Sequence, residues 1–187
     1  MAETRLHISA ILGAPVPLPE FFRRLDEIVA PLGFFHDSNK SSPRTRLEQG
    51  KGPLFTAKAT LINPVEIIDW PDYDRAFPLG QVILFYYITN DLLEDPDGEQ
   101  PFPLVLETWV KDEIEPNKTS RFRIVTNLFD YYSSTDWYPE ALDRITSLAS
   151  AIHQKFSCKR TTLYRGEHLD ILESPSQIVV EFARQGR

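Results

Sequence analysis

The stretch Gln81–Thr89, QVILFYYIT, is almost continuously apolar and aromatic. Such a run is typical of a strand that is covered on both faces, so we predict a strand here at the centre of a sheet. Residues 95–98 (DPDG) come next and favour a turn. The following run, Pro103–Lys111 (PLVLETWVK), is therefore predicted to pair with the first strand as its antiparallel neighbour.

Outward from this pair, apolar periodicity predicts two helices. The segment Leu18–Leu32 places apolar side chains at helical spacing, with Pro19 suited to the first turn and Gly33 to the residue just past the end. Asp136 is predicted to cap a second helix, which has Pro139 in its first turn and apolar residues at spacings of three and four. These apolar residues are Leu142, Ile145, Leu148, Ala149, Ile152 and Phe156.

Alternation with a period of two, or a β-prone composition, predicts the remaining strands. They cover Arg5–Leu12 (ended by a turn at residues 13–15), Leu54–Asn63, Arg121–Phe129, Thr161–Leu172 (a strand or a hairpin around Gly166), and Gln177–Phe182. The element order predicts an α+β fold: a single domain over residues 1–187, with a largely antiparallel sheet and two helices packed on one face. Residues 36–53 are predicted to form a mobile loop.

Composition narrows the class of protein. The chain has 187 residues, of which 42% are hydrophobic and one is a cysteine, Cys158. The N-terminus has no basic region followed by an apolar core, and no apolar run approaches the roughly 20 residues that span a bilayer. A single cysteine excludes an internal disulfide framework. We therefore expect a cytoplasmic protein without a membrane segment.

The net charge of −7 is unevenly distributed. Residues 66–115 contain thirteen Asp or Glu and only two basic residues, Arg75 and Lys111, whereas residues 31–63 carry five basic and two acidic residues. Binding to duplex nucleic acid requires clustered Lys and Arg, so nucleic acid is not an expected partner. A concentrated negative region instead favours encounter with a basic protein.

One motif favours an enzyme. His7-Ile8-Ser9 resembles half of the signature of two-histidine phosphoesterases, whose chemistry requires two such motifs facing one cleft. The other histidines, His36, His153 and His168, do not repeat the pattern. The alternative function is therefore a small hydrolase that uses His7 and Ser9, with His168 or His153 as the second imidazole; otherwise His7 is a structural strand residue.

Other chemistry receives less support from the sequence. Cys158 and His153 are five residues apart at a helix end and would face different directions, so they do not form a nucleophile and its base. Counting from Asp95 as the first position of a calcium loop, the ninth is Pro103 and the twelfth Leu106, which cannot supply the required ligands. Nucleotide-binding, phosphate-loop and nucleophile-elbow motifs are also missing from the sequence. No cofactor and no metal are expected.

Aromatic residues lie in or beside acidic sequence at seven positions: Trp70, Tyr73, Trp109, Tyr131, Tyr132, Trp137 and Tyr138. Most such residues in proteins are packing residues. Aromatic anchors ringed by charge are also the anatomy of a protein-binding hot spot. The predicted partner-binding residues are Trp70, Asp72, Tyr73, Asp74, Trp109 and Asp112.

The succession over Arg121–Leu172 carries a family resemblance. A strand (RFRIVTNLFD) is followed by a helix that opens with Trp (DWYPEALDRITSLASAIHQKF) and then by strands around Arg165-Gly166-Glu167. This order resembles the C-terminal half of bacterial immunity proteins from the Sit-type kin-recognition systems. The resemblance implies a non-enzymatic cytoplasmic protein whose partner is a toxin domain. The sequence thus predicts an immunity or antitoxin-like inhibitor of a basic partner, with a structural subunit or adaptor of a larger assembly as a further alternative.

Overall fold

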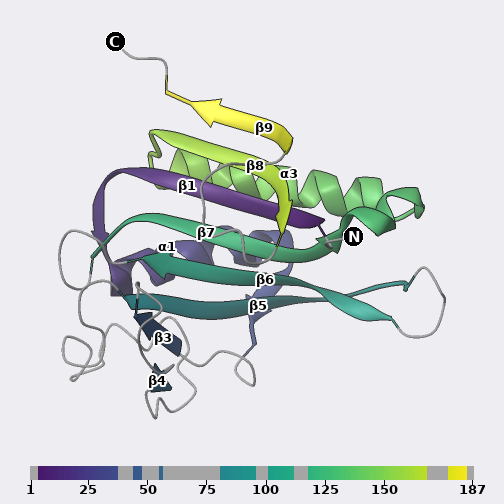
Figure 1. The fold of residues 1–187 in the computed structure, drawn as a ribbon, viewed down its shortest axis with the longest axis horizontal. Helices are drawn as coiled ribbons and strands as arrows, with labels where there is room; N and C mark the ends of the chain where they lie inside the picture. The colour runs from purple at the N-terminus through teal and green to yellow at the C-terminus, as the bar shows by residue number, and fades with distance from the viewer. Residues whose placement is uncertain are drawn as a thin grey trace.

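One antiparallel sheet organises the computed structural model of the chain (Figure 1). The structure describes residues 4–37, 44–47, 55–56, 81–95, 101–111, 118–167 and 177–184. The strands are β1 (Thr4–Pro17), β2 (Phe34–His36), β3 (Arg44–Leu47), β4 (Phe55–Thr56), β5 (Gln81–Leu93), β6 (Phe102–Lys111), β7 (Lys118–Phe129), β8 (Arg160–Glu167) and β9 (Gln177–Ala183). The described α-helices are α1 (Leu18–Val29) and α3 (Tyr138–Lys155), and 3-10 turns follow α1 and β7 as η1 (Ala30–Leu32) and η3 (Asp130–Ser134).

The strand order is β4-β3-β5-β6-β7-β1-β8-β9, and β2 also pairs with β5. Every strand pair is antiparallel, so the predicted α+β class and the predicted pairing of β5 with β6 are confirmed. The prediction that β5 occupies the centre was wrong. β5 is an interior strand, but β6 and β7 are central because β1 and β8 extend the sheet beyond β7.

The two faces of the sheet differ in what covers them. Along β1, Leu6, Ile8, Ala10 and Leu12 belong to the same buried core as the apolar residues of α1 and α3. Side chains alternate along a strand, so His7 points to the opposite side. Figure 1 shows both helices lying behind the sheet, and the prediction of two helices on one face is confirmed. We call the face opposite α1 and α3 the second face of the sheet.

β1 is longer than the sequence predicts. The strand continues through the predicted turn at residues 13–15 to Pro17, with a register irregularity against β7 between Ile11 and Val16. Gly13 allows a close approach there, because a Cβ at this position would lie 2.7 Å from the backbone oxygen of Ser157. The backbone N–H of Lys159 also donates to Ile11 O (2.8 Å). A single glycine thus lets the α3–β8 connection rest on β1.

α1 forms where its apolar periodicity predicted it. Pro19 lies in the first turn, and the chain tightens into η1 before Gly33 ends it in the left-handed region at φ 83°. On the buried side of the helix, the ring of Phe21 stacks on Phe156 (centroids 5.1 Å apart) and meets Phe122 edge-on (4.7 Å). Burial of a large apolar side chain is worth about 1.5–3 kcal/mol, so these rings fix α1 against α3 and β7.

α3 (Tyr138–Lys155) begins one residue later than predicted. Trp137, not Asp136, is the N-cap residue, and no side chain makes the cap hydrogen bond. Pro139 does lie in the first turn, as predicted. The aromatic contacts of Trp137 with Phe102 and Tyr132 hold the helix start in place, which explains why a polar cap is not required for its position.

One predicted loop contains a short strand, and two predicted strand segments are described only in part. The strand β3 (Arg44–Leu47) lies inside residues 36–53, which were predicted to be a loop, and it pairs with β5. Its four residues are too few to show a clear alternation. β4 covers Phe55–Thr56 of the strand predicted for residues 54–63, and the rest of that segment lies outside the described residues. The same is true of residues 168–172 of the strand or hairpin predicted for Thr161–Leu172, of which β8 covers the first part.

Candidate protein-binding surface

Of the six predicted partner-binding residues, the structure describes Trp109. It lies on β6 with its side chain half-buried on the second face of the sheet. The guanidinium carbon of Arg123, its cross-strand neighbour on β7, lies 5.3 Å from the centroid of the Trp109 ring. Trp70, Asp72, Tyr73, Asp74 and Asp112 lie outside the described residues, so their prediction stays untested.

The acidic region 66–115 is described only in part. Asp91, Glu94 and Asp95 lie at the end of β5, whereas Glu107 lies on β6 beside Tyr86 of β5 and Val125 of β7. The first three residues are therefore placed at one end of the sheet, and Glu107 is placed within its second face. The described carboxylates of this region thus occupy two different places.

The histidine motif does not combine with His153. His7 is fully buried on the second face, where its Nε2 donates to the carbonyl oxygen of Gly166 (3.1 Å) and its ring stacks on Tyr164 (5.1 Å). His153 lies on α3, with Nδ1 3.2 Å from the hydroxyl of Thr161, a residue on the helix-covered face. The two imidazoles are therefore on opposite sides of the sheet. His168 lies outside the described residues.

The feature that stands out in the described structure is a cluster of aromatic rings at one end of the sheet. We call it the aromatic corner, and it consists of Phe102, Phe129, Tyr131, Tyr132 and Trp137. Four elements meet there: β6 begins with Phe102, β7 ends with Phe129, η3 contains Tyr131 and Tyr132, and Trp137 precedes α3. In Figure 1 this corner is the end of the sheet where the N-terminus of β1 and the start of α3 lie.

The rings of the aromatic corner support each other. Tyr132 is buried at the centre, with ring centroids 5.0 Å from Trp137 and 5.3 Å from Phe102. Tyr131 stacks on Phe129 (5.2 Å, 15° between planes), and its hydroxyl lies 3.3 Å from that of Tyr132. The side chain of Tyr131 is nevertheless 51% exposed. The corner therefore presents a rigidly held aromatic ring to solvent.

Polar contacts hold η3 against the strands. The Nε of Arg165 on β8 forms an ion pair with Asp130 (2.9 Å), and its guanidinium also donates to the hydroxyl of Tyr138 (3.4 Å). The pKa of Arg165 is raised by the hydrogen bond to Tyr138 and, to a smaller extent, by the charge of Asp130. Thr4 of β1 donates to the same carboxylate. The position of Tyr131 is thus fixed by residues that are distant in the sequence.

The charges around the aromatic corner do not balance. Its three arginines are engaged: Arg144 with Asp91 (2.6 Å) and Glu140, Arg165 with Asp130, and Arg5 over the ring of Phe129 (4.4 Å). Three exposed carboxylates, one just after β5, one just before α3 and one in α3, have no ion-pair partner within the described parts of the chain. They are Glu94, Asp136 and Asp143. The corner therefore combines exposed aromatic surface with uncompensated negative charge.

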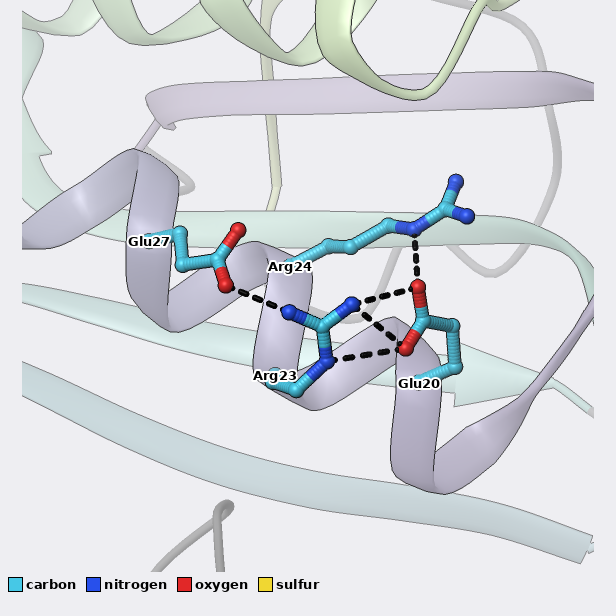
Figure 2. A network of polar contacts seen from close by, with 4 residues as sticks. All are labelled: Glu20, Arg23, Arg24 and Glu27. Atoms are coloured by element: carbon cyan, nitrogen blue, oxygen red, sulfur yellow. Dashed lines mark hydrogen bonds and ion pairs between the residues drawn. The ribbon is translucent and has the colours of Figure 1, made fainter.

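A second polar network lies on α1 and is internally balanced (Figure 2). Glu20 accepts from Arg23 (2.7 Å) and Arg24 (2.5 Å), and Arg23 also reaches Glu27 (2.5 Å). These hydrogen bonds, that from Arg23 first, lower the pKa of Glu20 against the smaller opposing effect of its burial. Pairs three or four residues apart on a helix surface are common and stabilise only slightly. We assign no site to this network.

Several other site classes receive no support from the described residues. None of them form a group of three or more His, Cys, Asp or Glu that could hold a metal ion. Nor does any helix in the described part of the chain have the length and apolarity needed to cross a membrane. Cys158 is buried, its thiol donates to Ile152 O (3.6 Å), and burial is the main reason its pKa is raised. A raised pKa leaves less reactive thiolate.

Sequence reasoning noted Tyr131, Tyr132 and Trp137 as aromatic residues in polar surroundings but did not select them. The available signal was the run of aromatic residues at 129–132 between a strand and a helix start. What the sequence did not reveal was that Phe102 and Arg5 join them. No protein-family model matches the chain, and no curated protein or solved structure is significantly similar to it. The resemblance of residues 121–172 to Sit-type immunity proteins therefore stays a prediction.

Proposed function

We propose that this chain is a non-enzymatic protein-binding domain that engages a basic partner, in the manner of an immunity or antitoxin-like inhibitor. The observation that carries the proposal is the aromatic corner, where the ring of Tyr131 is half exposed and where Glu94 and Asp136, at the same end of the sheet, have no ion-pair partner among the described residues. Aromatic residues are enriched at the centre of protein interfaces, where they lose water on binding. Complementary charge increases the rate of encounter and disfavours partners of the same sign.

The proposed mechanism is occlusion. A basic surface of the partner would be covered by this domain, with aromatic rings as desolvated anchors and carboxylates as the surrounding charge. Trp109 and the predicted set Trp70, Asp72, Tyr73, Asp74 and Asp112 remain proposed contributors to this contact. A toxin domain is the proposed partner class, on the strength of the family resemblance and of the net charge of −7.

The test is an affinity pull-down with the immobilised full chain, using native lysate and, separately, the product of the adjacent gene. Bound proteins are washed at low and then at high salt. Charge steering predicts a stoichiometric basic partner that salt releases, and an association rate that falls as ionic strength rises. If no protein is retained at either salt concentration, the proposed function is wrong.

A further inference from the structure

We infer that the aromatic corner takes an arginine side chain of the basic partner, with the guanidinium stacked on the exposed ring of Tyr131 and attracted by the exposed carboxylates at the same end of the sheet. This inference rests on the proposed function and names the docking site within it. The corner lies at the end of β7, whereas Trp109 pairs with Arg123 in the middle of that strand. The corner therefore does not include Trp109, the one predicted partner-binding residue that the structure describes.

The ring of Tyr131 is held in a fixed orientation by neighbouring rings. One side packs on Phe129 at 15° between planes, and Tyr132 supports its edge at 4.3 Å between centroids. An exposed side chain usually loses rotamer freedom on binding, which weakens association. Because Tyr131 is already held by its neighbours, that cost is small, while 51% of the side chain stays open to a partner.

The molecule itself shows the chemistry of the proposed contact. Arg5 lies with its guanidinium 4.4 Å from the centroid of Phe129, and Arg123 lies 5.3 Å from that of Trp109. A planar guanidinium stacks on an aromatic face and can still donate sideways to carboxylates. Within the described residues, no cation lies over Tyr131, although its stacking partner Phe129 carries one.

The surrounding charge selects a cation. Glu94, Asp136 and Asp143 are exposed and have no ion-pair partner within the described residues, whereas Arg5, Arg144 and Arg165 are all engaged. Asp136 is adjacent to Trp137, and Glu94 follows Leu93, the cross-strand partner of Phe102. An anionic group would be repelled by this excess of negative charge, and a purely apolar group would gain nothing from it. The flat donor fork of arginine fits both the ring and the carboxylates better than the point charge of lysine.

The direct test uses a capped tripeptide, acetyl-Gly-Arg-Gly-amide, titrated into the isotopically labelled full chain and followed by NMR. We expect the largest chemical-shift changes at Tyr131, Tyr132 and Asp136. The matched peptide with citrulline, which keeps the shape of arginine but loses its charge, should cause little change. Free L-arginine should bind more weakly than the capped peptide, because its own carboxylate is repelled by the corner.

Variants separate the ring from the charge. Tyr131→Ala should weaken binding of the arginine peptide about two- to fivefold, the range expected for an exposed cation–aromatic contact. Tyr131→Phe keeps the stacked ring and should bind nearly as well as the wild type. Ile178→Ala removes another exposed apolar side chain on β9 and is the matched control, expected to have no effect. Shifts spread evenly over acidic residues, with equal amplitude in Tyr131→Ala, would overturn the inference.

The pull-down then tests the arginine docking site separately from the proposed function. With the salt-sensitive partner in hand, Tyr131→Ala should retain clearly less of it than the wild type or Ile178→Ala. Equal retention by all three proteins would overturn the docking site and leave the proposed function intact. Absence of any salt-sensitive partner for the wild type would instead refute the proposed function itself.

Discussion

Two aromatic clusters lie at the two ends of α3, and they differ in how much of their surface is exposed to solvent. At the helix C-terminus, Phe156 packs with Phe21 and Phe122, all at most 4% exposed. At the N-terminus, the aromatic corner leaves Tyr131 half exposed. The first cluster contains only phenylalanine and closes the core, whereas the second mixes tyrosine, tryptophan and phenylalanine. The difference shows that aromatic content alone does not mark a binding surface; its exposure and surrounding charge do.

The charges at the two ends differ in the same way. The start of α3 is preceded by Asp136 and carries Glu140 and Asp143, whereas its last turn contains His153 and Lys155. Acidic residues near a helix N-terminus and basic residues near the C-terminus each stabilise a helix by about 0.3–1 kcal/mol. Part of this difference in charge between the two ends is therefore explained by stabilisation of the helix. Glu94, which follows β5, has no such explanation and adds to the negative charge at this end.

The largest expected effect comes from the buried cluster. Phe156→Ala should lower the free energy of unfolding by about 3–5 kcal/mol, because it removes a ring and leaves a cavity between α1, α3 and β7. Tyr131→Ala at the other end should cost less than about 1 kcal/mol, since half of that side chain is already in water. Chemical denaturation of both variants measures the difference. Equal losses would mean that the aromatic corner is part of the core.

The second prediction concerns association with the basic partner. The triple variant Glu94→Gln, Asp136→Asn, Asp143→Asn should lower the association rate roughly tenfold at low salt and flatten its salt dependence. A matched variant at the opposite end, Lys155→Gln, Lys159→Gln, Arg160→Gln, should leave the rate unchanged or raise it. Stopped-flow measurements at several ionic strengths test both. If only the variant at residues 155, 159 and 160 associates more slowly, the partner contacts the C-terminal end of α3 and the prediction is wrong.

The third prediction is a pH dependence. Burial, assisted by the charge of Glu27, raises the pKa of Asp26 on α1. A carboxyl with a raised pKa in the folded state binds its proton more tightly in the folded protein than in the unfolded chain. Stability therefore falls as the pH increases from the ordinary pKa of Asp, about 3.9, through the raised pKa of the folded state. Asp26→Asn should remove this loss and stabilise the protein at pH 7 by less than about 1 kcal/mol, because Asp26 is partly exposed.

Thermal unfolding at two pH values checks the sign of this effect. At pH 3, where Asp26 is protonated in both the folded and the unfolded state, the variant and the wild type should unfold at nearly the same temperature. At pH 7 the variant should unfold at the higher temperature. The reverse order at pH 7 would show that the Asp26 carboxylate has a favourable partner in the folded protein.

The smallest effect is expected in the α1 ion pairs of Figure 2. Arg23→Ala should bring the pKa of Glu20 back up towards its ordinary value, because the hydrogen bond from Arg23 is the main cause of the depression. An NMR titration of the Glu20 carboxyl measures the change. Binding of the arginine peptide should be unaffected, and a large loss of peptide affinity would relocate the docking site to α1.

The local elements could be predicted because their signals are short-range. The apolar run of β5, the turn residues before β6 and the helical spacing of α1 all depend on neighbours within a few residues. Errors arose where distant contacts decide. The start of α3 is set by the contacts of Trp137 with Phe102 and Tyr132 rather than by Asp136, and β1 continues past Gly13 because the α3–β8 connection packs against it.

By itself, the sequence determined the α+β class, the antiparallel partner of β5 and the acidic character of the chain. Only the tertiary structure decided which residues share a surface. Phe102, Tyr131 and Arg5 are far apart in the chain, and they meet because β1 lies beside β7 and β6 lies on its other side. Strand order depends on the closing of long loops and on the packing of entire sheet and helix faces, so it cannot be predicted from local periodicity.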